Sequence, residues 1–189
     1  MSSYRTKTRF AVAAVACALV LFARTASADP IAVVVDKDGS GLVVTVNVPG
    51  VNVHFSYDQS CEDGKPCYSI EASQGMVGVA VSAPSCKVDD GTAYTPTGVQ
   101  CPASATSIQF KLAAGGTWSA YAGGGGQHTG TTCSPARVIV TTGKGANSVN
   151  SWDGCTETIH CDLGPGDFAG VEVDASDEID GKCSSVVKH

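Results

Sequence analysis

Residues 51–57 read VNVHFSY, and this stretch decides the fold class. Apolar residues at positions 51, 53, 55 and 57 alternate with polar residues at 52, 54 and 56. A period of two places alternate side chains on opposite faces of a strand, so one face is buried and the other meets solvent. Pro49-Gly50, a typical turn pair, comes directly before it. The sequence therefore predicts a half-buried β-strand.

Further strand signals lie on both sides of this stretch. Runs rich in β-branched or other apolar residues occur at Ile31–Val35, Leu42–Val48, Met76–Val81, Ile108–Leu112, Arg137–Thr141 and Val171–Val173. The chain has 22 glycines and no long apolar stripe of helical period, and both features argue against helices. We therefore predict an all-β protein.

A weak repeat is visible in the second half when three segments are aligned on their final glycines. FKLAAGG ends at Gly116, IVTTGKG at Gly145 and HCDLGPG at Gly166, at intervals of 29 and 21 residues. Each is an apolar strand running into a glycine turn, the pattern that one coil of a β-solenoid produces. Any glycine-rich β protein could show this coincidence. A β-sandwich is the structural alternative, because residues 31–81 carry hairpin-like strand signals.

The N-terminus has the organisation of a signal peptide. Three basic residues precede an apolar run, and small residues follow it: Arg5, Lys7 and Arg9, then the run from 10 to 22, then Ala26-Ser27-Ala28. Such a run enters the translocon, and the small residues suit a signal peptidase that cuts before Asp29. An uncleaved membrane anchor would need about 20 apolar residues, more than this run has. We therefore predict that the protein is secreted.

Cleavage would leave residues 29–189 as a single secreted all-β domain, with a subdivision near residue 85 left open. The whole chain carries 12 basic and 18 acidic residues, a net charge of −6. Residues 1–28 hold four of the basic ones, so the mature charge is −10. An acidic surface repels phosphate backbones and anionic membranes. We therefore expect no nucleic-acid partner, no stable membrane insertion, and cations as small ligands.

Eight cysteines remain after cleavage: Cys61, Cys67, Cys86, Cys101, Cys133, Cys155, Cys161 and Cys183. An even number in an exported chain indicates four disulfides. Eight cysteines allow 105 pairings, so spacing does not fix the connectivity. The simplest scheme pairs neighbours, as Cys61–Cys67, Cys86–Cys101 and Cys155–Cys161, and ties down the C-terminus with Cys133–Cys183. No Cys-x-x-Cys pair occurs and the four histidines are scattered, which argues against zinc.

Residues 142–150, TGKGANSVN, resemble the nonapeptide G-G-x-G-x-D-x-U-x of haemolysin-type (repeats-in-toxin) calcium-binding proteins. The order of features from 85 to 183 also resembles secreted bacterial proteins with degenerate copies of those repeats. These features are Cys86, then Cys101-Pro102, a glycine-rich β segment, and an acidic stretch at 174–180 before Cys183. The resemblance implies a parallel β-solenoid or β-roll and, in good copies, calcium between successive turns.

Candidate calcium ligands lie in or beside the glycine turns. They offer side-chain oxygens, the donors that calcium prefers, and are Asn147, Asp153, Asp162 and Asp167. The nonapeptide has Asp at its sixth position, where this chain has Asn147 in one copy and Phe168 in another. Calcium takes six to eight oxygen ligands, more than a single turn supplies. The alternative interpretation is that these residues are ordinary solvated turn residues. A denser acidic group near the end could bind a cation or be a solvated segment: Asp174, Asp177, Glu178 and Asp180.

The chain contains no G-x-S-x-G, H-E-x-x-H or D-T/S-G catalytic motif, and paired cysteines would leave no thiolate nucleophile. We predict a non-enzymatic extracellular structural or interaction protein, with calcium as the one cofactor considered. An alternative is a carbohydrate- or protein-binding module with an aromatic patch of Trp118, Tyr121 and Trp152, rings that could equally pack in the core. A hidden hydrolase would use one of the histidines His54, His128 and His160.

Overall fold

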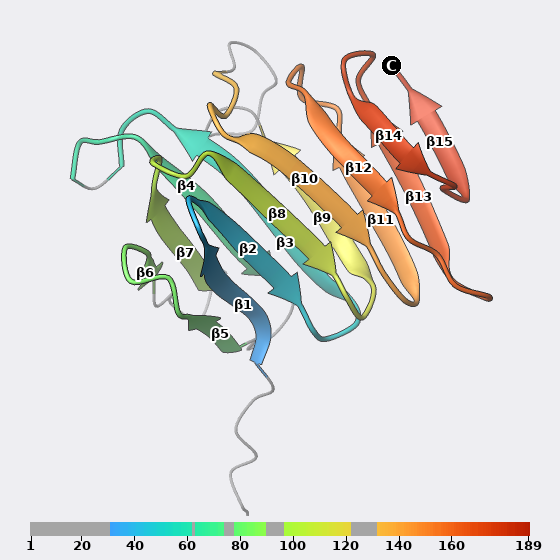
Figure 1. Cartoon of the computed structure of the whole chain (residues 1–189), viewed down its shortest axis with the longest axis horizontal. Helices are drawn as coiled ribbons and strands as arrows, with labels where there is room; N and C mark the ends of the chain where they lie inside the picture. The colour runs from blue at the N-terminus through green and yellow to red at the C-terminus, as the bar shows by residue number, and fades with distance from the viewer. Residues whose placement is uncertain (1–30, 62, 74–77, 90–96, 122–131) are drawn as a thin grey trace, which may run out of the picture.

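The computed structural model describes residues 31–61, 63–73, 78–89, 97–121 and 132–189. The predicted signal peptide, residues 1–28, lies outside the described residues. The part that is described consists of strands and their connections without a helix (Figure 1). The prediction of an all-β protein is therefore confirmed.

The strands are short and follow one another closely. In chain order they are β1 (Ile31–Asp38), β2 (Gly41–Val46), β3 (Val51–Asp58), β4 (Cys67–Ser73), β5 (Gly78–Val81), β6 (Lys87–Asp89), β7 (Thr97–Pro102), β8 (Ser107–Leu112), β9 (Gly116–Tyr121), β10 (Arg137–Thr142), β11 (Ala146–Ser151), β12 (Glu157–Cys161), β13 (Phe168–Val173), β14 (Glu178–Gly181) and β15 (Ser185–Lys188). The alternation at 51–57 corresponds to β3, whose buried and partly exposed residues alternate as predicted.

These strands form two sheets. Sheet A has the order β14-β12-β10-β8-β2-β1-β5, and sheet B has the order β15-β13-β11-β9-β3-β4-β7-β6. Successive strand pairs, β2–β3, β8–β9, β10–β11, β12–β13 and β14–β15, each place one strand in sheet A and the next in sheet B. Within each sheet these strands run parallel to one another. The chain therefore alternates between the sheets as it advances along the stack (Figure 1).

The N-terminal end of the stack is built differently. β1 pairs antiparallel with β2, while β4, β7 and β6 extend sheet B by antiparallel pairing from β3. Residues 31–81, whose pattern predicts hairpin-like strands, contain two such antiparallel pairs, β1–β2 and β3–β4. β5 pairs parallel with β1 and is the last strand of sheet A, while β6 is the last strand of sheet B at this end. The sheets are therefore mixed.

The core lies between the two sheets. In sheet A, Val44, Phe110, Val140 and Ile159 occupy one inward column of aligned residues. Sheet B contributes a facing column, namely Val53, Trp118, Val149 and Val171. Each of these side chains is at most 2% exposed. The rings of Phe110 and Trp118 lie 5.4 Å apart between centroids, so the two sheets meet through direct side-chain packing.

The connections between strands gather at two opposite edges of the stack. We call the edge with turns from sheet A to sheet B the glycine rim; it holds residues 47–50, 113–115, 143–145, 162–167 and 182–184. We call the opposite edge the loop rim; it holds residues 132–136, 152–156 and 174–177. Gly115 and Gly145 turn with φ of 84° and 83°. A Cβ at Gly115 would lie 2.9 Å from the Ala146 carbonyl oxygen, so this turn requires glycine.

The strand register differs by one residue from the alignment on final glycines. Phe110 pairs with Val140 and not with Ile139, so Gly115, not Gly116, is the counterpart of Gly145. Gly116 instead begins β9, where it pairs with Asn147. Two adjacent glycines made the sequence alignment ambiguous, and only backbone conformation separates the turn residue from the strand residue.

Two of the predicted disulfides are confirmed and two are wrong. Cys61–Cys67 and Cys86–Cys101 form as expected. The others are Cys133–Cys155 and Cys161–Cys183, in place of Cys155–Cys161 and Cys133–Cys183. Cys155 precedes β12 at the loop rim, whereas Cys161 ends it at the glycine rim. At about 3.3 Å per residue the strand separates them well beyond the reach of a disulfide.

Candidate functional site

The structure places the predicted calcium ligands at both rims. Asn147, Asp162 and Asp167 lie at the glycine rim, while Asp153 lies at the loop rim between β11 and β12. A strand of six residues separates the rims by roughly 20 Å. One ion therefore cannot contact all four side chains.

At the glycine rim, two of these side chains bind the backbone of neighbouring turns. Asn147 is 2% exposed, and its Nδ2 donates to the carbonyl oxygens of Gly143 at 2.8 Å and Phe168 at 3.2 Å. The Asp167 carboxylate accepts hydrogen bonds from the backbone N–H groups of Gly145 at 2.7 Å and Gly164 at 2.9 Å. Both side chains therefore join one strand pair to the next, and Asp162 is exposed beside them.

At the loop rim, Asp177 is buried and fully hydrogen-bonded. Its Oδ1 accepts from the N–H of Glu157 at 2.8 Å. Its Oδ2 accepts from the Ser151 hydroxyl at 2.7 Å and the Asp174 N–H at 2.8 Å. These three donors satisfy both oxygens of the buried carboxylate. Asp177 thereby ties β11 and β12 to the connection that precedes β14.

Two more carboxylates belong to this rim, Asp174 in the same connection as Asp177 and Asp153 in the connection between β11 and β12. Asp174 accepts hydrogen bonds from the backbone N–H groups of Asp153, at 2.9 Å, and Gly154. Asp153 in turn accepts from the Cys155 N–H at 2.9 Å. Burial raises the pKa of Asp153 to about 6, and the charges of Asp174 and Asp177 raise it as well. These residues, with Asp177 and Glu157, form what we call the acidic cluster.

Glu157 belongs to the acidic cluster, although the sequence analysis did not single it out. It pairs with the buried Val138 in β10 and is itself 3% exposed. Its Oε2 has no hydrogen-bond partner among the described residues. Burial raises its pKa to about 9, and the charges of Asp153 and Asp177 add to the shift. A signal was available, because the period of two puts Glu157 on the same face as the apolar Ile159.

A small cavity lies against the acidic cluster. Its volume is about 10 Å³, the room that one water-sized occupant needs. Its lining joins Asp153, Cys155 and Glu157 to side chains from β3 and from the connection before β10, namely Phe55, Tyr57, Thr132 and Ser134. The site can therefore offer carboxylate and hydroxyl oxygens to a single small occupant.

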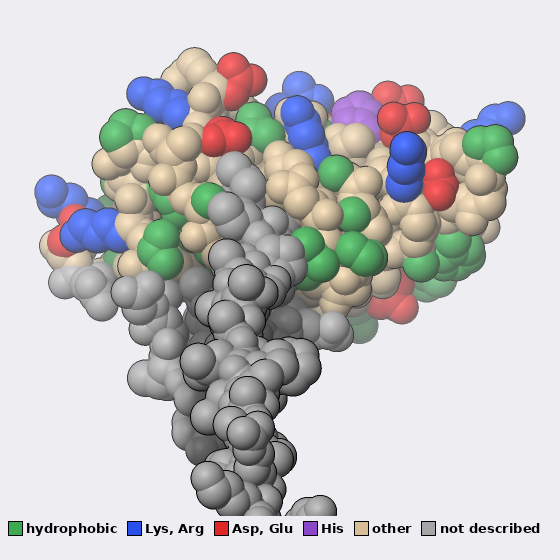
Figure 2. Space-filling view, turned by 90° about the horizontal axis from the view of Figure 1, so that it is seen from below, with side chains coloured by type: hydrophobic (Ala, Val, Ile, Leu, Met, Phe, Trp, Pro, Cys, Tyr) green, Lys and Arg blue, Asp and Glu red, His purple; other side chains and the backbone are tan. Residues whose placement is uncertain are grey.

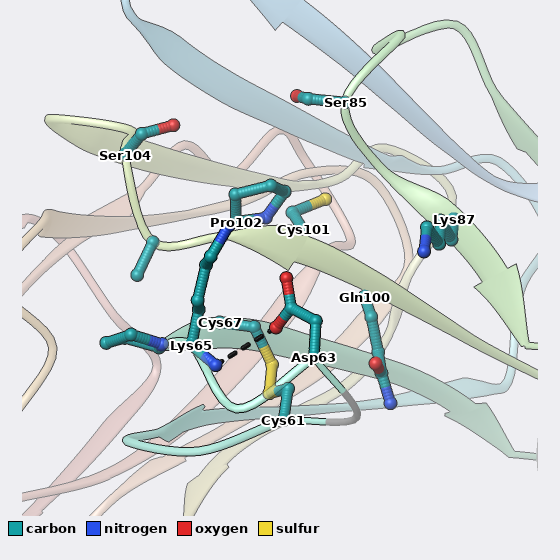
Figure 3. Close-up of a pocket in the computed structure, with 12 residues that line it drawn as sticks. Cys61, Asp63, Lys65, Cys67, Ser85, Lys87, Gln100, Cys101, Pro102 and Ser104 are labelled. Carbon is teal, nitrogen blue, oxygen red and sulfur yellow. Dashed lines mark hydrogen bonds between the residues drawn. A yellow bond between two sulfur atoms is a disulfide. The ribbon is translucent and has the colours of Figure 1, made fainter.

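A larger cavity of about 340 Å³ lies at the opposite end of the stack, between the disulfides Cys61–Cys67 and Cys86–Cys101 (Figure 3). It has the size of a small-molecule site. Lys65, Lys87 and Gln100 are among its lining residues. Its Asp63 accepts a hydrogen bond from the Lys65 N–H at 3.0 Å. Asp58 lies close to Cys61 and Cys67, but sulfurs in a disulfide are not thiolate ligands, so these residues do not form a metal site.

The predicted aromatic patch does not form. Trp118 is fully buried in the core, which makes its assignment to a binding surface wrong. The side chain of Tyr121 lies outside the described residues. Trp152 is 49% exposed, and its ring stacks on His189 at 4.1 Å between centroids. Trp118 packs in the core because a large aromatic ring buries more apolar area there than a smaller side chain would.

Two of the three histidines are described, and His128 lies outside the described residues. His160 forms an ion pair with Asp180, with Nδ1 and Oδ2 2.9 Å apart. The Nδ1 of His54 lies 2.6 Å from the Ser119 hydroxyl oxygen. A hydrolase needs such a base beside a nucleophile, but Ser119 is only 8% exposed. Its hydroxyl is therefore poorly placed to meet a substrate.

Comparison of the chain with protein-family models, curated proteins and solved structures finds no match. Among the described residues, no helix has the length and apolarity to cross a membrane. Four disulfides fit an oxidising, extracellular type of environment.

Proposed function

We propose that this protein is a secreted, non-enzymatic structural and interaction protein of the extracellular space, built as a two-sheeted β-solenoid. In this proposal each strand pair is one coil. The parallel ladders, the glycine turns and the side chains that link successive turns support it. The same arrangement is consistent with a distant relationship to the haemolysin-type repeat proteins.

The observation that carries the proposal is the placement of two disulfides. Cys133–Cys155 and Cys161–Cys183 each join residues 22 positions apart. The first clamps two consecutive coils at the loop rim and the second clamps two at the glycine rim. A stack of coils frays from its end, because each coil contacts only its neighbours. Covalent clamps at both rims prevent such fraying, a need that is greatest outside the cell.

Interaction is proposed at the end of the stack that carries β14 and β15. Each of them is the last strand of its sheet, so its outer backbone groups have no ladder partner among the described residues. Val186 and Val187 are 42% and 46% exposed, and hydrophobic side chains surface towards this end in Figure 2. Exposed edge strands of this kind accept a further strand.

A second copy of the chain fits this end best. A twofold axis parallel to the strands would set β14 of one copy antiparallel to β15 of the other, at two equivalent junctions. β14 carries Glu178 and Asp180, whereas β15 carries Lys188. Opposite charges would therefore meet at each junction, and the exposed valines would be covered.

Light scattering during gel filtration of the oxidised chain 29–189 tests this interaction. We expect a dimer at high concentration that dissociates on dilution. Val187→Lys should abolish it, because the new charge lies on the edge strand. The matched control is Val88→Lys on β6, at the opposite end of sheet B from β15. Val88 is 40% exposed, and this variant should leave the dimer intact. A wild-type chain that stays monomeric at all concentrations would exclude a second copy as the partner.

A further inference from the structure

The inward side of sheet A changes from apolar to acidic near the loop rim. The register places Glu157 in one column with Leu42, Ile108 and Val138, which are at most 6% exposed. Asp177 comes next in this column, because the following residue, Glu178, pairs with Thr158. Two carboxyl groups thus stand where earlier coils bury aliphatic side chains. Burial of such groups is costly unless a partner compensates.

The two carboxyl groups differ in how they are satisfied. Asp177 accepts three hydrogen bonds from protein donors. Glu157 is as deeply buried and shares a side-chain hydrogen bond with Asp177, but its Oε2 has no partner among the described residues. Glu157 and Asp153 line the same small cavity, so an occupant of that cavity would lie against both carboxyl groups.

Arg137 begins β10, the strand that pairs with β12 and its Glu157, but it does not form an ion pair with the acidic cluster. Arg137 donates to the Thr158 hydroxyl at 3.4 Å. The one ion pair among the described residues joins His160 to Asp180. The cluster of Asp153, Glu157, Asp174 and Asp177 therefore has no ion-pair partner in the described part of the chain, and its carboxylates repel one another.

Neutral oxygens complete the lining of the cavity. Ser134, Thr132 and Tyr57 each contribute a hydroxyl group. The Ser134 hydroxyl accepts a hydrogen bond from the Ala136 N–H at 3.1 Å, and the Thr132 hydroxyl accepts one from Gln59 at 2.8 Å. Each oxygen retains a lone pair. Thr132 and Ser134 flank Cys133, so the Cys133–Cys155 disulfide fixes these two hydroxyls relative to Asp153.

We propose that this cavity at the loop rim binds a calcium ion, which takes the place of the proton on Glu157 and is held by the carboxylates of Asp153 and Glu157 and by hydroxyl oxygens of the lining. Calcium accepts irregular sets of six to eight oxygens, whereas magnesium demands near-octahedral geometry and retains its waters. Two charged ligands correspond to a weak site, in the range of about 10⁻⁴ to 10⁻³ M that is typical of extracellular modules. The site is separate from the glycine turns and independent of dimer formation.

The test is calcium titration of the oxidised chain 29–189, followed by thermal unfolding and by terbium luminescence. Terbium serves as a calcium analogue, and Trp152, which precedes Asp153 in the sequence, is the expected sensitiser. We expect the unfolding midpoint to rise with calcium and terbium emission to be displaced by calcium. Glu157→Gln and Asp153→Asn should weaken affinity by at least about tenfold, since charged ligands set the affinity. Asp167→Asn, the matched control at the glycine rim, should bind calcium as the wild type does.

Three results would overturn the proposal. Absence of any calcium or terbium binding by the folded wild-type chain would exclude the site. If Asp167→Asn abolished calcium binding and Glu157→Gln kept it, the ion would have to bind at the glycine rim and not at the loop rim. A Glu157→Gln chain that is more stable than the wild type in saturating calcium would mean that Glu157 holds a proton only. Gln has the same shape as a protonated Glu, so this variant is expected to fold.

Discussion

Glu157 gives the folded protein a specific dependence on pH. Its pKa is about 9 when folded against an ordinary value of 4.5, so the folded state binds this proton more tightly than the unfolded state. The contribution of Glu157 to the free energy of unfolding is fully present below about pH 4.5 and is lost as the pH rises through about 9. Asp153, Asp174 and Asp177 face it from the adjacent loops, and Tyr57 lines the same cavity.

We therefore expect the free energy of unfolding, measured with a chelator present, to fall as the pH rises from about 5 to about 9. The fall should exceed about 1 kcal/mol, which is the free energy that corresponds to a shift of one pKa unit. Urea titrations at several pH values measure this fall. Glu157→Gln should flatten the profile, because an amide cannot ionise; the share from Asp153 would remain below about pH 6. A wild-type profile as flat as that of the variant would contradict the assignment.

Asn147 permits a second prediction at the residue scale. Its amide donates to carbonyl oxygens of two neighbouring turns. Asn147→Asp restores the acidic residue of the nonapeptide, but it directs a buried carboxylate at those oxygens. Losing these hydrogen bonds should cost about 1–3 kcal/mol. Urea unfolding in chelator measures this loss, and a variant as stable as the wild type would show that Asn147 does not join the turns.

At the scale of elements, the disulfide Cys161–Cys183, which joins two successive strand pairs, should contribute more to stability than Cys61–Cys67, which closes a short loop. Loop-closure entropy predicts about 3 kcal/mol for the 22-residue loop of Cys161–Cys183 and about 2 kcal/mol for the six-residue loop of Cys61–Cys67. Paired Cys→Ser variants and their urea midpoints measure the difference. The account would be wrong if removing Cys161–Cys183 left the midpoint unchanged.

Some of the strands could be predicted from local pattern, namely β1, β2, β3, β5, β8, β10 and β13, whereas the other strands and the pairing of all of them could not. The alternation at 51–57 predicts β3 because the period of two is a local property. The partners of Cys155 and Cys161 depend on which strands stack on one another, a long-range property that spacing does not encode. Two adjacent glycines, Gly115 and Gly116, likewise conceal the true register until backbone conformation separates them.

The candidate site was only partly predictable. Asp153, Asp174 and Asp177 were noticed as acidic residues near turns, yet they were assigned to separate groups. The loop rim brings them together because successive strand pairs repeat the same kind of connection from sheet B to sheet A. Glu157 was missed because a charged residue in a strand is usually solvent-exposed. Trp118 could be assigned either to a binding patch or to the core from its aromatic character alone, and the structure places it in the core.

At the scale of the whole molecule, the central claim is that parallel strand pairs stack and that disulfides clamp consecutive pairs. Mapping the disulfides of the protein from culture medium, without reduction, tests this claim most directly. Trypsin combined with a protease that cleaves after Glu157 separates Cys155 from Cys161. The account predicts peptides joined as Cys133–Cys155 and Cys161–Cys183. Peptides joined as Cys155–Cys161, or free thiols at these positions, would contradict the stacking.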